Sequence, residues 1–145
     1  MITPVIVANN FIARALNENV PLTPMKLQKL IYFLYKEYLK TTGERLFTES
    51  FEVWQYGPVI ASVYDEFKGF GGSSITRFAR DSIGDVYTVL EEGDFKTCFE
   101  KIWGQFRCYT GWELSRITHA DGTAWLEARK NNAYHLSDED IKNEQ

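Results

Sequence analysis

The segment of residues 23–43 constrains the fold most, because it carries large apolar and aromatic side chains on several of its sides. Thr23 is a residue type that caps helices, and Pro24 suits the first helical turn. We therefore predict a helix that begins at Pro24 and ends near Gly43, a typical helix terminator. An apolar stripe with helical spacing follows the cap: Leu27, Leu30, Ile31 and Leu34. Aromatic side chains occupy other sides of the same helix: Tyr32, Phe33, Tyr35 and Tyr38. This helix is predicted to be central and packed on several faces.

The rest of the chain predicts a mainly α fold, a compact single helical domain over residues 1–145 with a small β-hairpin or two short strands. The chain has 145 residues, a typical length for one domain, and shows neither an internal repeat nor a linker. A last short helix is expected after Ser137, a capping residue that has Asp140 three positions later. Apolar residues at helical spacing predict further helices over residues 4–17, 94–106, 110–117 and 123–130.

The β-element is expected around residues 51–56, a β-prone stretch that is followed at once by Gly57 and Pro58. We interpret this pair as the end of the strand, with Pro58 opening a third helix that runs to about Lys68. Residues 85–90 suggest a second short strand that would pair with the first.

Composition excludes several classes of protein. An apolar share of 44% argues against disorder, and no apolar run approaches the ~20 residues of a membrane span. The first residues lack the pattern of a signal peptide, so a cytoplasmic location is expected. A net charge of −4 argues against direct nucleic-acid binding, which needs clustered basic residues. The acidic clusters at residues 91–94 and 138–140 are expected to begin helices.

Motifs for catalysis, cofactors and metals are absent from the sequence. Cys98 and Cys108 are interpreted as free, buried thiols, and their spacing to His119 fits no zinc pattern. The sequence contains no phosphate-binding loop, no dinucleotide fingerprint and no nucleophile elbow. Ser115 and His119 are triad residue types, but the structural interpretation is favoured: His119 ends a helix and bonds its carbonyls. We therefore predict no catalytic activity, cofactor or metal.

Polar residues within apolar sequence leave two interpretations open. Gln28 is either a buried hydrogen-bonding bridge or an exposed recognition group, and the bridge is favoured. Lys26 and Lys29 are expected on a solvated face of the central helix. Tyr56 and Tyr64 are expected to be core residues with satisfied hydroxyls rather than ligand contacts.

Two long motifs, at residues 22–33 and 46–59, are similar to those of the Panacea domain family, the SocA-like antitoxin domain that is also seen as a phage-associated protein. The spacing of Glu113, His119 and Trp125 resembles the carboxy-terminal half of the family, so the resemblance covers nearly the whole chain. The chain departs from the family pattern at two packing positions: Ala124 stands where the family usually has proline, and Val53 where it has alanine.

The resemblance implies an antitoxin of a type II toxin–antitoxin system, which neutralises a toxin encoded by a neighbouring gene through direct protein binding. The alternatives are an adaptor that delivers the toxin to a AAA+ protease, and a regulatory binding protein of a phage or mobile element. The sequence leaves open whether the protein forms a homodimer. The predicted partner surface lies at the start of the central helix and around the strand. Its candidate residues are Lys26, Gln28, Lys29, Tyr32, Trp54, Tyr56, Tyr64, His119 and Trp125.

Overall fold

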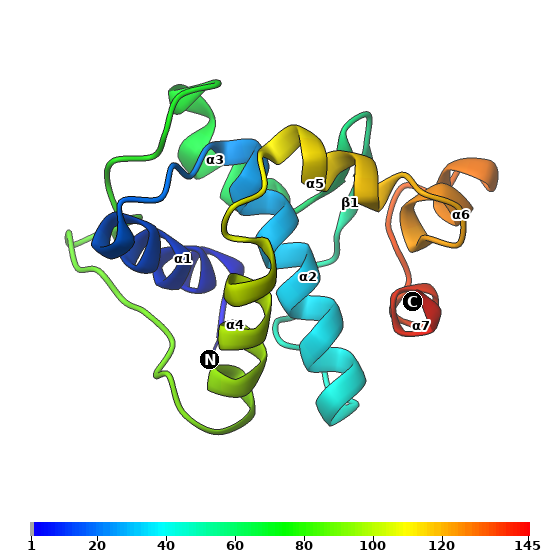
Figure 1. Cartoon of the computed structure of the whole chain (residues 1–145), viewed down its shortest axis with the longest axis horizontal. Helices are drawn as coiled ribbons and strands as arrows, with labels where there is room; N and C mark the ends of the chain where they lie inside the picture. Colours follow the sequence, from blue (N-terminus) through cyan, green and yellow to red (C-terminus); the bar gives the residue numbers. More distant parts are fainter. Residues whose placement is uncertain (1) are drawn as a thin grey trace.

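A computed structural model describes residues 2–145 and has one helix, α2, at its centre (Figure 1). Helices α1 and α4 lie on one side of α2, whereas α6 and α7 lie on the other; α5 and a small hairpin cover its amino-terminal half. The elements are α1 (Pro4–Glu18), α2 (Pro24–Thr42), β1 (Glu52–Trp54), β2 (Gly57–Val59), α3 (Ala61–Phe67), η1 (Lys68–Phe70), α4 (Gly93–Phe106), α5 (Gly111–Thr118), α6 (Ala124–Lys130) and α7 (Asp138–Asn143). The mainly α prediction with a small β-element is confirmed.

Helix α2 begins and ends where its sequence predicts. The Thr23 hydroxyl accepts a hydrogen bond from the Lys26 amide at 3.2 Å, and Gly43 closes the helix with a φ of 75°. Its aromatic side chains hold the layers together: Phe33 stacks on Phe106 of α4 at 4.5 Å between ring centroids. Aromatic pairs of this kind stabilise a core beyond the area they bury. Helix α2 is therefore the element on which the others pack.

The β-hairpin differs from the expectation. Gly57 and Pro58 form the second strand, in register with Trp54 and Val53, and do not end the sheet. Gly57 has a φ of 120°, a conformation that glycine adopts without strain. A strand at a sheet edge tolerates proline, because its missing N–H would point away from the pairing. The third helix consequently begins at Ala61 rather than at Pro58.

The second strand expected at residues 85–90 is also wrong, because this segment is irregular and lies against α1. Two buried asparagines supply the hydrogen bonds that a neighbouring strand would have supplied. The Asn9 amide donates to the Tyr87 carbonyl at 2.9 Å. Asn10 donates to the Val89 carbonyl at 2.8 Å and accepts from the Val89 amide at 2.7 Å. Side-chain amides that pair with backbone in this way replace sheet formation.

The carboxy-terminal segment is tied to α2 by a buried carboxylate. Ser137 caps α7 by accepting from the Asp140 amide, as predicted. Beyond this helix, Glu144 accepts hydrogen bonds from the Tyr32 hydroxyl at 2.7 Å and from the Ala124 amide at 2.8 Å. Lys36 forms an ion pair with the same carboxylate at 2.7 Å. The alanine at position 124 matters here, because proline has no N–H to donate.

The two cysteines occupy different environments. Cys98 is buried in α4, as expected, but Cys108 is exposed, because it lies in the turn that follows the helix. In residues 2–145, no group of three or more histidine, cysteine or carboxylate side chains is arranged to hold a metal ion. Of the helices that the structure describes, none has the length and apolar character that crossing a bilayer requires.

Candidate functional site

The hairpin turn is held from behind by hydrogen bonds to three successive backbone carbonyls. The Trp125 indole donates to the Trp54 carbonyl at 2.8 Å, and Ser115 donates to the Tyr56 carbonyl at 2.6 Å. Between them, Nε2 of His119 lies 2.9 Å from the carbonyl oxygen of Gln55. The turn is therefore fixed to α5 and α6 rather than free in solvent.

The side chains of His119 and Trp125 contact each other behind this turn. Their rings lie edge to face at 3.8 Å, and Nδ1 of His119 lies 2.5 Å from the Ser115 carbonyl. Both histidine nitrogens thus face carbonyl oxygens, which only accept hydrogen bonds. The predicted role of His119 at a helix end is confirmed.

The front of the hairpin is held by two side chains of α2. Gln28 donates to the Ile60 carbonyl at 3.1 Å and accepts from the Ile60 amide at 2.9 Å, so the predicted buried bridge is confirmed. Lys29 donates to the Pro58 carbonyl at 3.0 Å. The prediction of a solvated Lys29 is wrong, since only 1% of its surface is exposed. Burial lowers the pKa of this ammonium group from 10.5 to about 7.

Gly57 is needed at the point where the hairpin crosses Lys29. A Cβ atom built on Gly57 would lie 2.7 Å from the Thr118 hydroxyl and 2.8 Å from Cε of Lys29. Both distances are below any normal van der Waals contact. The positive φ and the close approach together explain why this position takes glycine.

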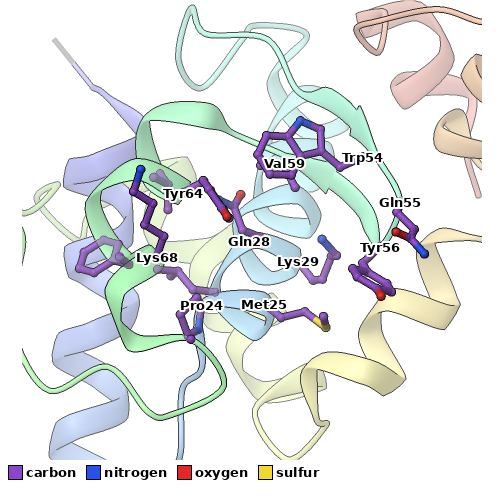
Figure 2. A pocket seen from close by; sticks show the side chains of 14 residues that line it. Pro24, Met25, Gln28, Lys29, Trp54, Gln55, Tyr56, Val59, Tyr64 and Lys68 are labelled. Atoms are coloured by element: carbon purple, nitrogen blue, oxygen red, sulfur yellow. The ribbon is translucent and has the colours of Figure 1, made fainter.

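A cavity of about 410 Å³ opens beside Lys29, between α2, the hairpin and α3 (Figure 2). Its wall is mostly apolar and aromatic. Tyr64 of α3 packs edge to face on Trp54 at 4.7 Å, and together they close one side. Five of the residues that the sequence predicted for partner binding line this cavity: Gln28, Lys29, Trp54, Tyr56 and Tyr64.

The mouth of the cavity continues into an exposed aromatic pair. Tyr56, at the tip of the hairpin, is 46% exposed and packs edge to face on Trp112 of α5 at 5.2 Å. The prediction that Tyr56 and Tyr64 belong to the core is wrong, because the turn and the outer side of α3 leave both rings partly in solvent. Trp112 is 60% exposed and was not predicted, although a tryptophan among polar residues of a short helix is a usable signal.

The remaining predicted residues lie away from this surface. Lys26 is buried rather than solvated, because its ammonium group reaches the Arg107 carbonyl at the end of α4. Burial lowers the pKa of Lys26. Tyr32 is fully buried against Glu144, and desolvation beside that carboxylate raises its pKa. Lys26 and Tyr32 therefore stabilise helix packing and are not available to a partner.

The part of the chain that matches a known family includes the residues that hold the hairpin. The family described as "Antitoxin SocA-like, Panacea domain" matches residues 27–126, a range that contains Gln28, Lys29, the hairpin, Ser115 and His119. The chain is 27% identical over 124 residues to "Antitoxin SocA" of Caulobacter vibrioides (strain NA1000 / CB15N). That alignment covers 82% of this chain and 66% of the relative, so the chain spans just under two thirds of the relative's length. No solved structure matches the chain. The chain belongs to the SocA-like antitoxin family with a Panacea domain.

Proposed function

We propose that this protein is an antitoxin, a single binding domain over residues 1–145 that neutralises a toxin by direct contact. Membership of the SocA-like family supports this proposal, as does the name of its relative, "Antitoxin SocA". The surface assigned to the toxin is formed by Tyr56, Trp112 and the cavity beside them. The proposal contains no covalent step, so neutralisation is occlusion of the toxin.

The observation that carries the proposal is the exposed Tyr56–Trp112 pair on a rigid support. Tyrosine and tryptophan are the residue types that dominate binding energy at protein interfaces. The hairpin that carries Tyr56 is held through the carbonyls of residues 54–56 by α5 and α6. Because this turn is already ordered, binding loses little conformational entropy there.

Co-expression with the product of the neighbouring gene tests the proposal. That product is expected to stop growth when expressed alone, and this protein is expected to restore it. A neighbouring product that is harmless alone, or that remains toxic beside this protein, contradicts the proposal. The half-life of the toxin, followed by pulse-chase, is expected to stay unchanged, whereas a shortened half-life would contradict occlusion and indicate delivery to a protease.

Matched variants locate the surface. Tyr56→Ser and Trp112→Ser are each expected to weaken toxin binding about 30-fold or more, the effect of removing a hot-spot side chain. Ile83→Ser is the control, because Ile83 is 80% exposed but lies on the loop between η1 and α4. Far-UV circular dichroism verifies that all three variants fold. Equal loss of binding in the control, or full binding in both aromatic variants, would refute this surface.

A further inference from the structure

The cavity beside the hairpin has an unusual charge pattern for an apolar pocket. Two of the described residues that line it are lysines, Lys29 in the wall and Lys68 of η1, and none is aspartate or glutamate. The other lining residues are apolar, aromatic, or amides and glycine. A pocket with this lining favours a ligand that combines an apolar body with negative charge.

Among residues 2–145, no carboxylate forms an ion pair with Lys29. Its ammonium group has three N–H donors, and its hydrogen bond in the described part of the chain is to the Pro58 carbonyl. Desolvation is the cause of its lowered pKa, with no carboxylate acting against it. Lys68 contacts Asp65 at 3.6 Å, but both side chains are more than half exposed, which makes that pair weak. A buried cation in the wall of a cavity attracts an anion through a medium of low dielectric constant.

We propose that this cavity binds a small organic monocarboxylate with an apolar, preferably aromatic, body. The carboxylate lies toward Lys29, and the body packs against Trp54 and Tyr64, whereas Lys68 lies at the opposite end of the cavity (Figure 2). A volume of about 410 Å³ is within the range of small-molecule sites. The cavity is part of the surface assigned to the toxin, but its binding test needs no toxin, so the two proposals can fail separately.

Binding of 3-phenylpropanoate to the purified full chain, measured by calorimetry, tests the charge requirement. The uncharged 3-phenylpropan-1-ol has nearly the same shape and is expected to bind about tenfold more weakly or worse, because it cannot form the ion pair. Protein NMR is expected to show the largest shift at the indole N–H of Trp54. Equal affinity for the alcohol, or no binding of the acid, would overturn the proposal. Tighter binding of a peptide that ends in phenylalanine would instead assign the site to a chain terminus and overturn a small-molecule role.

Variants of the two lysines separate this site from general attraction of anions. Lys68→Gln changes an exposed side chain at the other end of the cavity, so the fold is expected to persist, and affinity for 3-phenylpropanoate should fall by no more than about twofold. Lys29→Met should remove most of the preference for the acid over the alcohol. Lys96→Gln, an exposed lysine on α4, is the control and should bind as the parent does. An unchanged preference for the acid in Lys29→Met, or an equal loss of affinity in Lys68→Gln, would contradict the assignment.

The dependence on pH provides a further readout. Affinity for the acid is expected to fall between pH 6 and pH 9 as Lys29 loses its proton, and proton uptake on binding should accompany it near neutral pH. The nearby elements also carry other charged and titratable groups: Lys26 on α2, Glu52 and Tyr56 on the hairpin, Tyr64, Asp65 and Glu66 on α3, Lys68 on η1, Glu113 and Arg116 on α5, and His119 at the end of α5. Lys29→Met keeps all of these groups. A pH dependence that persists in this variant would therefore assign the effect elsewhere and refute the role of Lys29.

Discussion

Replacing Lys29 with methionine should change how the stability of the protein depends on pH. Burial lowers the pKa of Lys29 from 10.5 in the unfolded chain to about 7 in the folded protein. Between these two values, the unfolded chain binds more protons than the folded protein does. Stability of the parent therefore rises with pH across this window, and below pH 7 the cost of burying the charge is present in full.

The size of this cost follows from the difference between the two pKa values. At 1.36 kcal/mol per pH unit, a fall from 10.5 to about 7 corresponds to about 5 kcal/mol. Methionine has nearly the same length and carries no charge, so the variant does not bear this cost. The variant does lose the hydrogen bond to the Pro58 carbonyl, which is worth about 1 kcal/mol. We expect Lys29→Met to be more stable than the parent at pH 6, with this advantage almost lost by pH 9.5.

Urea denaturation followed by far-UV circular dichroism measures this difference at several values of pH. Taking the variant minus the parent cancels the contribution of every other titrating group. Measurements stop at pH 9.5, because burial raises the pKa of Tyr32 and Tyr35 and their ionisation would destabilise the fold above pH 10. Lys96→Met, at an exposed position on α4, is the control and should show a difference that does not vary with pH.

A constant difference between Lys29→Met and the parent from pH 6 to pH 9.5 would refute the reasoning. It would mean that Lys29 keeps an ordinary pKa in the folded protein and is solvated there. A destabilised variant at every pH would lead to the same conclusion if the difference stayed constant. The test therefore depends on the slope with pH and not on the absolute stability of the variant.

Four further experiments have defined outcomes. Gly57→Ala should destabilise the fold by about 3–5 kcal/mol in urea denaturation, because its Cβ would lie 2.7 Å from a threonine hydroxyl at a φ of 120°. Gly104→Ala, with no atom within 4 Å of the added Cβ in the interior of α4, should instead stabilise by about 0.5–1 kcal/mol. Ala124→Pro should lower stability by about 1–2 kcal/mol, since it removes the amide that donates to the buried carboxylate of the carboxy-terminal segment. Cys108 should react with a thiol reagent in the native protein, whereas Cys98 should react only after unfolding; equal rates would contradict the burial of α4.

Local signals in the chain predicted most of the helices, but not the start of α3. Thr23 and Ser137 accept hydrogen bonds from the helix amides that they were predicted to cap, and Gly43 ends α2 with a positive φ. Caps and apolar periodicity act within a few residues, so they can be recognised without knowing the fold. The buried bridge at Gln28 could also be predicted, because an amide among so many apolar residues needs a partner.

The extent of the hairpin and the burial of Lys29 beneath it depend on contacts between residues that are distant in the sequence. Gly57 and Pro58 look locally like the end of a strand, but pairing with β1 and support from α5 make them part of the sheet. In the sequence, Lys29 was predicted to lie on a solvated face of the central helix. The hairpin packs across this face and buries the ammonium group. Tertiary structure decided both outcomes, because burial is a property of what packs on a residue and not of its neighbours along the chain.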